Sequence, residues 1–430
     1  MIEPRGIIVR YIYSACVVTH TPDLRLLHDP WFTDGIYDGS WFQFPEVPDP
    51  FERIGDVDMI YVSHIHPDHY DGGFLKRYFA RFGVKPVLIA DHKPNHLAGK
   101  MRADGIAPTI LEADLVLGRT RVRIVPHRTG HVYDIDSALV LHYEDEAGRT
   151  HCVVNANDII FDVGMRDRLK VAAGEIDILL CGYTGAGPYP QTYFDLDDPR
   201  LPGAAAAKKQ AFFERYRSLT GHMAAKVNIP FAGQYLLGGK LAPLNAMRGV
   251  ADAAEVLAFD PRAVVLADVG GEIGTVDLVP TATRTKPYES AAMARRVAVI
   301  DGAKMKYERL IDAGEVDQLP LRRLLAMAYK KAIGLSNCGE DYFFCIALPN
   351  GRSAMLNANR NVADGLCFLD PGAELPEPHS EIRVDPRYLF GLLTHIYHWN
   401  SAEVGSQYET RRSPDILNRA AQAFLNFLAV

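Results

Sequence analysis

Two hydrophobic patterns alternate along the first 270 residues of the chain. Apolar residues at helical spacing predict helices at residues 73–82 and 204–227. Short runs rich in apolar and β-branched residues predict strands at residues 7–13, 24–28, 57–63, 87–90, 121–125, 138–142, 152–155, 176–180 and 263–267. Many strands with helices between them indicate a layered α/β domain whose helices lie outside the sheets.

The pattern changes at residues 275–288, where Thr, Pro and basic residues predominate, and we place a domain junction there. Beyond it, residues 319–333 predict an amphipathic helix. An Asn-Gly pair at Asn350 and Gly351 between two apolar runs predicts a β-hairpin, and helices are expected to follow it. We therefore expect a first domain at residues 1–280 and a smaller α+β domain at residues 300–430.

Composition and charge exclude several classes of protein. The 430 residues are 48% apolar and 23% charged, which excludes a disordered chain, a collagen-like repeat and a coiled coil. The net charge of −7 leaves no basic surplus for duplex nucleic acid. The sequence contains no apolar run of about 18 residues, so no transmembrane helix is expected. Six scattered cysteines without a Cys-x-x-Cys pair favour a reducing compartment, so we expect a cytoplasmic protein.

Four residues with metal-binding side chains follow the predicted strand at residues 57–63. Residues 60–73 read IYVSHIHPDHYDGG. Because strand side chains alternate, His64 and His66 share a side and can bind one cation. Asp68 and His69 lie in the turn that follows and can reach a neighbouring position. Imidazole together with carboxylate suits zinc, iron or manganese better than calcium.

This His-x-His-x-Asp-His motif resembles the signature of the metallo-β-lactamase superfamily. The resemblance implies an αββα sandwich with one or two metal ions at one edge of the sheets. It implies that His64, His66 and a later histidine form one metal position. Asp68 and His69 would form a second position, and a later aspartate would bridge the two.

The later ligands are sought in two segments. The third histidine is His131 or His127, and we favour His131 because a predicted strand follows it closely. A surface histidine at a strand end is the alternative role for His127. Asp158, after the strand at residues 152–155, fits the bridging aspartate, although it could instead cap a helix.

One segment departs from the superfamily pattern. Such proteins usually supply a further histidine after a late strand, but residues 228–235 read NIPFAGQY. His222 lies upstream, in the predicted helix at residues 204–227. The second metal position is therefore expected to be incomplete or to be completed by another group.

Three further segments narrow the resemblance. Residues 27–41, 178–193 and 228–235, together with the metal motif, are similar to the catalytic part of CMP-N-acetylneuraminate hydroxylases and their bacterial relatives. Residues 383–414 resemble a sterol-carrier-like domain found in those bacterial relatives. The hydroxylases also carry a Rieske centre, which needs two Cys and two His ligands. This sequence contains no Cys-x-His pair, so we expect electrons from a separate ferredoxin or Rieske protein.

Two other clusters offer weaker candidates for ligand binding. In the glycine-rich residues 181–190, Gly185 and Gly187 would let the backbone approach a substrate, and Tyr183 could stack on a ring. An ordinary tight loop is an equally good interpretation. Near the C-terminus, Asn400 and its neighbours form a polar cluster beside Trp399, and we favour helix capping as their role.

These observations lead to three hypotheses. The first is an iron-dependent oxygenase acting on a small polar substrate of the nucleotide-sugar kind, with Asp68 and Asp158 as catalytic groups. The second is a hydrolase that uses metal-activated water. The third is a binding protein with a vestigial metal site. The expected metal ligands are His64, His66, Asp68, His69, His131 and Asp158.

Overall fold

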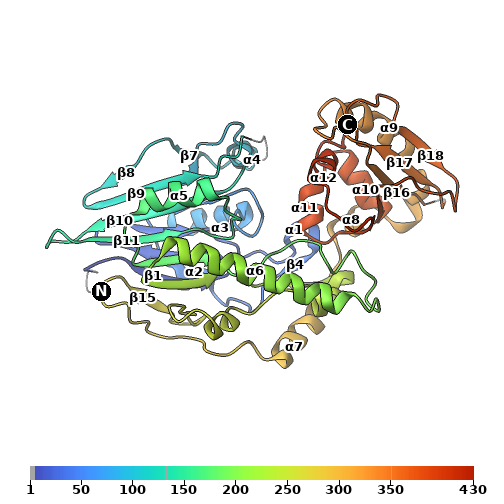
Figure 1. Ribbon diagram of the computed structural model, residues 1–430. Coiled ribbons are helices and arrows are strands. Elements are labelled where there is room, and N and C mark those ends of the chain that lie inside the picture. The colour runs from blue at the N-terminus through green and yellow to red at the C-terminus, as the bar shows by residue number, and fades with distance from the viewer. Residues whose placement is uncertain (1–4, 131–133, 350) are drawn as a thin grey trace.

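Two facing sheets form the larger part of the molecule in this computed structural model, which describes residues 5–130, 134–349 and 351–430 (Figure 1). The first sheet has the order β15-β1-β2-β3-β5-β6-β7 and the second has the order β13-β12-β11-β10-β9-β8. Strands of the first sheet are β1 (Ile8–Tyr13), β2 (Cys16–His20), β3 (Arg25–His28), β5 (Met59–Tyr61), β6 (Val87–Ala90), β7 (Pro108–Leu111) and β15 (Glu272–Gly274). Strands of the second sheet are β8 (Leu115–Leu117), β9 (Thr120–Pro126), β10 (Ser137–Glu144), β11 (Thr150–Asn155), β12 (Ile178–Gly182) and β13 (Val227–Phe231).

Helices cover the outer face of each sheet. On the first sheet these are α3 (Gly72–Phe82) and α4 (His96–Ala103), and on the second sheet they are α5 (Val163–Ala173) and α6 (Leu201–Met223). Successive residues of a strand alternate between the interface of the two sheets and the interface of a sheet with its helices. Leu26 packs between the sheets, whereas its neighbour Leu27 packs under the helices. Burial on both faces explains why these strands are continuous apolar runs. The expected αββα sandwich is confirmed.

A third sheet with its own helices forms a second lobe, at the upper right of Figure 1. Its five strands have the order β18-β17-β16-β19-β20. They are β16 (Phe343–Ala347), β17 (Ser353–Asn357), β18 (Leu366–Leu369), β19 (His379–Val384) and β20 (Tyr408–Ser413). The helices that pack with them are α9 (Leu321–Ile333), α10 (Pro386–Leu393), α11 (Trp399–Val404) and α12 (Arg419–Leu425). β16 and β17 pair as the predicted hairpin, although Asn350 lies outside the described residues.

Shorter elements complete the structure. β4 (Trp41–Phe42) pairs with β14 (Leu236–Leu237). The short helices are α1 (Ile36–Gly39), α2 (Pro50–Ile54), α7 (Ser290–Ile300), α8 (Lys306–Leu310) and the 3₁₀ helices Gly239–Met247, Ala253–Ala258 and Ala313–Gln318. One apolar cluster continues from the helix-covered face of the first sheet through Trp41 into the second lobe. Across the described ranges, every helix is too short or too polar to cross a membrane.

Three expectations about secondary structure are wrong. The helix expected at residues 204–227 ends at Met223, because Ala224 takes a left-handed backbone conformation (φ 50°) and the chain then enters β13. Residues 263–267 make only isolated bridges, so they do not form a regular strand. The C-terminal region expected to be helical also contains β19 and β20. Short apolar runs fit either a strand or a buried helix, and only their neighbours decide between the two.

A buried histidine at the end of β3 predicts acid sensitivity. Burial lowers the pKa of His28 from 6.5 to about 3. The neutral ring accepts a hydrogen bond from Asn155 at Nδ1 (3.0 Å) and contacts Thr19 Oγ1 through Nε2 (2.9 Å). The unfolded chain therefore binds this proton more readily than the folded chain. Its contribution to stability is complete above pH 6.5 and is lost as the pH falls toward 3, by about 1.4 kcal/mol per pH unit.

Between pH 6.5 and 4, the unfolding free energy of His28→Gln is expected to fall less steeply with pH than that of the wild type, by about 1.4 kcal/mol per pH unit. Urea unfolding at several pH values measures it, with His222→Gln on the surface of α6 as the control. An unchanged slope in the His28 variant would show that this ring does not limit acid stability.

Candidate metal centre

The loop between β5 and α3 carries the metal-binding motif at one edge of the first sheet. His64 Nε2 and His66 Nδ1 face each other at 2.9 Å. The loop ends at Asp71, which caps α3 by accepting a hydrogen bond from the Phe74 amide (2.8 Å). The strand end and the helix start therefore fix the motif at both ends.

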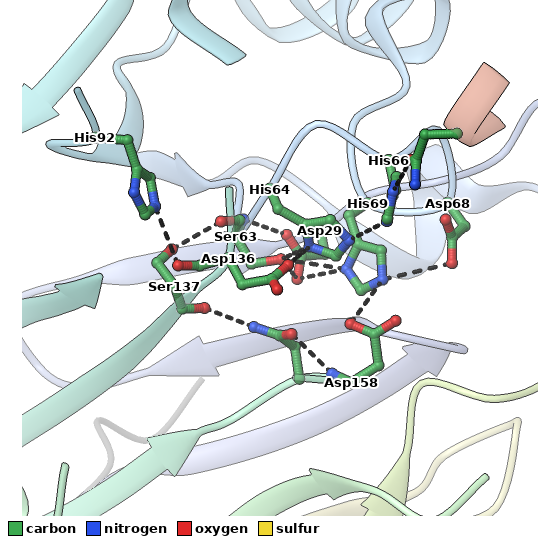
Figure 2. Close-up of polar contacts among 12 residues, drawn as sticks. Asp29, Ser63, His64, His66, Asp68, His69, His92, Asp136, Ser137 and Asp158 are labelled. Atoms are coloured by element: carbon green, nitrogen blue, oxygen red, sulfur yellow. Dashed lines mark hydrogen bonds and ion pairs between the residues drawn. The ribbon is translucent and has the colours of Figure 1, made fainter. Parts of the chain in front are cut away.

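A second group of side chains converges on His69. Its Nε2 lies 3.4 Å from Asp68 Oδ2 and 3.5 Å from Asp158 Oδ1 (Figure 2). Nitrogen and oxygen atoms of His64, His69 and Asp158 all lie within 4.8 Å of one another. Asp158 does not cap α5, because Asp162 does so. The structure thus brings together five of the six ligands expected from the sequence: His64, His66, Asp68, His69 and Asp158.

Asp158 reaches this edge because two backbone segments pass close together. β11 ends at Asn155, and the carbonyl of Asn157 accepts a hydrogen bond from the Gly182 amide at the end of β12 (2.7 Å). A β-carbon at Gly182 would lie 3.1 Å from the Asp158 α-carbon. Glycine at this position therefore allows the loop that carries Asp158 to lie against β12.

A buried carboxylate behind His69 was not predicted from the sequence. Asp29 is fully buried, and its Oδ2 lies 3.0 Å from His69 Nδ1. It also accepts hydrogen bonds from the Ser63 amide (2.7 Å) and hydroxyl (2.8 Å). An imidazole held through Nδ1 by a carboxylate presents Nε2 to a metal, which is the usual outer-shell arrangement. Asp29 directly follows β3, which pairs in parallel with β5. A polar residue at the end of the strand predicted at residues 24–28 was therefore the only sequence feature that could have indicated it.

A further carboxylate, Asp136, also lies beside the cluster (Figure 2). Its Oδ1 is 3.9 Å from His64 Nδ1, and it directly precedes β10. Burial and the nearby Asp158 raise the pKa of Asp136. No sequence pattern marks this residue, because a single aspartate before a strand is common in turns.

The electrostatics of the cluster favour a bound cation. Burial alone would lower the pKa of His69, but Asp158, Asp68 and Asp29 raise it well above its usual range. The ion pairs of these three carboxylates within the described residues are all made to His69. Burial lowers the pKa of His64, and the adjacent histidines lower it further, so its ring is neutral and can act as a ligand. The neutral His64 ring lies beside carboxylates that, among the described residues, pair with His69 rather than with Lys or Arg, and this donor set fits a divalent metal. A bound cation would take the place of the proton that these carboxylates favour on His69.

Only one of the two candidates for the third histidine lies among the described residues. His127 Nε2 contacts Asp162 Oδ2 at 2.9 Å, at the start of α5 and outside the cluster. His131 lies outside the described residues, so its role stays a prediction.

His131→Ala is expected to lower metal content, because it would remove one ligand of the first position, whereas His127→Ala should keep the wild-type content. Elemental analysis of both purified variants measures this. Metal loss in the His127 variant alone would reverse the assignment.

A cavity of about 200 Å³ opens beside the cluster. His66, Asp68 and Asp158 line it, together with Gly185 and Gly187 of the glycine-rich loop. The space of a Gly185 β-carbon is filled by the Phe212 ring, so glycine is needed there for packing. Tyr183 is buried and borders a different, smaller cavity.

The segment after β13 forms another wall of this cavity with Ala232, Gly233 and Tyr235. Tyr235 stacks on Trp41 with ring centroids 3.4 Å apart. His222 pairs with Asp167 on the outer helices (3.2 Å) and lies away from the cluster. In the described part of the chain, therefore, the late strand end contributes small and aromatic side chains rather than a histidine.

The αββα sandwich with this motif at its edge defines a protein of the metallo-β-lactamase fold. Comparisons with known proteins confirm the resemblance to the hydroxylases. A protein of Mycolicibacterium smegmatis named as a Rieske 2Fe-2S iron–sulfur protein is 30% identical over 273 residues, covering 60% of this chain and 49% of that protein. The gorilla cytidine monophosphate-N-acetylneuraminic acid hydroxylase is 22% identical over 237 residues, covering 53% and 38%. The chain thus spans about half the length, or less, of these curated relatives.

Solved structures with weaker similarity include a diiron β-hydroxylase and a hydrolase. CmlA from Streptomyces venezuelae is 16% identical, with a TM-score of 0.37 and coverage of 58% of this chain and 48% of that chain. An isothiocyanate hydrolase from Delia radicum gut bacteria is 16% identical, with a TM-score of 0.41 and coverage of 62% and 98%. No protein-family model matches the chain.

Proposed function

We propose that this protein is an iron-dependent oxygenase of the hydroxylase type that acts on a small polar substrate. The observation that carries the proposal is the wall of the cavity after β13. Ala232 and Gly233 stand there, where a histidine would complete the second metal position. A His and carboxylate site that keeps open positions is the arrangement that suits iron and oxygen. The similarity to the hydroxylases points in the same direction.

Each side chain of the cluster has a distinct role in this proposal. His64, His66 and His131 hold one metal position. Asp68 and His69 hold the other, and Asp158 lies between them. Iron bound there would supply the capacity to activate oxygen. The protein's own contribution is to keep both positions at one edge of the cavity. The electrons come from a separate ferredoxin or Rieske protein.

The substrate would enter the cavity between the metal ligands and the glycine-rich loop. Gly185 and Gly187 bring backbone close to the ligand, and the Trp41–Tyr235 stack forms an aromatic wall. A volume of about 200 Å³ accommodates part of a nucleotide-sugar rather than all of it. We propose that the lobe division at residues 1–280 and 300–430 corresponds to two domains, and that the protein works in the cytoplasm.

A hydrolase is the second candidate, and the pair of carboxylates favours it. Asp68 and Asp158 each place an oxygen about equally far from His69 Nε2 (3.4 and 3.5 Å). A divalent metal between them would lower the pKa of a bound water to about 7, and either aspartate could orient that water.

Oxygen consumption distinguishes the two candidates. The protein is loaded anaerobically with iron, reduced with dithionite, freed of excess reductant and mixed with oxygenated buffer. The oxygenase proposal predicts oxygen uptake that depends on iron and is lost in Asp158→Asn. The zinc-loaded protein serves as the control and is also assayed with ester and phosphodiester probes. Turnover of those probes with zinc, and no oxygen uptake with iron, would establish the hydrolase instead.

A further inference from the structure

The second lobe reaches the metal cluster directly. Asn400, in the first turn of α11, places its Oδ1 3.0 Å from His66 Nε2. The two residues are 334 positions apart in the sequence. α11 is held in place by its buried residues Trp399 and Ala402, and the Trp399 indole donates a hydrogen bond to the Leu428 carbonyl (2.9 Å). The position of Asn400 is therefore fixed by the core of the second lobe.

The contact determines which nitrogen of His66 is available to a metal. A neutral imidazole carries its proton on one ring nitrogen and a lone pair on the other. The amide oxygen of Asn400 can only accept a hydrogen bond, so it places the proton of His66 on Nε2. The lone pair is then on Nδ1, which is the atom that faces His64 Nε2 at 2.9 Å.

We propose that Asn400 is a positioning residue for the metal site, since it fixes the tautomer and orientation in which His66 binds metal through Nδ1. The inference rests on the proposed metal site and extends it to the second lobe. An outer-shell partner of this kind makes its histidine ligand more basic and restricts its rotation. Metal affinity then depends on a lobe that supplies no direct ligand among the residues we assign.

A second connection from the same segment reaches Asp68. The buried Gln407 donates a hydrogen bond from Nε2 to the carbonyl of Tyr37 (2.8 Å). The Tyr37 hydroxyl in turn donates to Asp68 Oδ1 (2.6 Å). This leaves Asp68 Oδ2 on the side of His69 Nε2. Residues 400–407 thus contact a ligand of the first metal position directly and a support of the second through Tyr37, and Val404 between them borders the cavity.

Three replacements of Asn400 in the full chain test the proposal. Asn400→Leu keeps the size and removes the acceptor, Asn400→Ala removes both, and Asn400→Asp keeps an acceptor without a donor. Tyr388→Phe is the matched control, because it removes a different hydrogen bond between the lobes, from Tyr388 to Asp38 (2.8 Å). Zinc affinity is measured by competition with a chromophoric chelator, and the melting temperature of each metal-free variant is recorded alongside.

We expect Asn400→Leu and Asn400→Ala to bind zinc about 10- to 100-fold more weakly than the wild type, as other outer-shell losses do. Asn400→Asp should stay within about threefold of the wild type, and Tyr388→Phe should not change the affinity. Wild-type affinity in Asn400→Leu would overturn the proposal. Weakening in Tyr388→Phe equal to that in Asn400→Leu would do the same, because it would reflect general loosening of the lobes.

The tautomer is read separately in the metal-free protein, by nitrogen NMR on chains labelled at histidine, with His66→Gln to assign the signal. The proposal predicts a protonated Nε2 in the wild type and a changed tautomer population in Asn400→Leu. A protonated Nδ1 in the wild type would overturn it. Because this measurement needs no metal, it decides the role of Asn400 even if the protein binds neither zinc nor iron. In that case the proposed function would fail independently.

Discussion

Asp29→Asn is expected to weaken metal binding by about 10- to 100-fold while leaving the fold intact, because it alters the residue that orients a ligand. Asp29 holds His69 Nδ1 at 3.0 Å and accepts two hydrogen bonds from Ser63. An asparagine of the same size offers only one acceptor oxygen. Its side-chain NH₂ group would face a hydrogen-bond donor of Ser63 or His69, so one of these hydrogen bonds would be lost. The negative charge that favours a cation at His69 would be lost as well. Calorimetric titration of the metal-free protein with zinc measures the change.

Asp177→Asn is the matched control for this variant. Asp177 is also a buried carboxylate, and it accepts a hydrogen bond from the Cys152 amide (2.9 Å) and pairs with Lys226 (2.6 Å). It lies at the opposite end of β11 from the metal cluster. Its loss should lower the melting temperature without changing zinc affinity. Equal zinc affinities of the Asp29 variant and the wild type would mean that His69 needs no carboxylate support.

His64→Ala is expected to remove almost all bound metal, since it deletes a ligand at the centre of the cluster. His64 Nε2 faces His66 Nδ1, and its ring lies beside that of His69, with centroids 4.0 Å apart and the ring planes tilted by 42°. Loss of a direct ligand should exceed the effect of an outer-shell change, so we expect at least about a hundredfold weaker binding. Metal content after dialysis against buffer with trace metal measures it.

Two additional variants keep this result interpretable. His64 is buried, so alanine leaves a cavity; His64→Gln fills most of the space and should lose metal to a similar degree. His222→Ala removes a histidine that pairs with Asp167 away from the cluster, and it should keep wild-type metal content. Full metal retention in both His64 variants would show that the metal site has been assigned to the wrong residues.

The motif at residues 60–73 could be predicted because its chemistry is local. The strand alternation expected for His64 and His66 does not apply, because β5 ends at Tyr61; both histidines lie in the loop that follows, and the turn before α3 brings Asp68 and His69 to the same edge. Asp158 was identified because the resemblance implies a later bridging aspartate and because this residue follows a predicted strand. For the motif itself, a few consecutive residues contain the whole signal.

The supporting residues could not be predicted because their roles depend on pairing between distant segments. Asp29 reaches His69 only because β3 lies parallel to β5. Asn400 had the pattern of a helix cap, yet His398 is the capping residue of α11 and Asn400 contacts His66 instead. A contact between residues 334 positions apart leaves no local pattern in a single sequence.

The secondary structure likewise contains elements that local patterns predict and elements that they do not. The strand at residues 87–90 matches β6, and the helix at residues 319–333 matches α9 to within two residues, because continuous apolar runs and helical spacing mark them. β2 was not predicted, since Cys16–His20 ends in polar residues and follows β1 after a tight turn. The helix expected at residues 204–227 runs past its true end at Met223 and overlaps β13 only at Val227.

The metal content of the purified protein tests the central claim most directly. The full chain is purified anaerobically from cells grown with iron and zinc both present, and its metals are measured by elemental analysis. The account predicts one to two iron ions per chain in the wild type and almost none in His64→Ala. A wild-type protein that carries no stoichiometric metal would contradict the metal site, and one that carries only zinc would contradict the oxygenase.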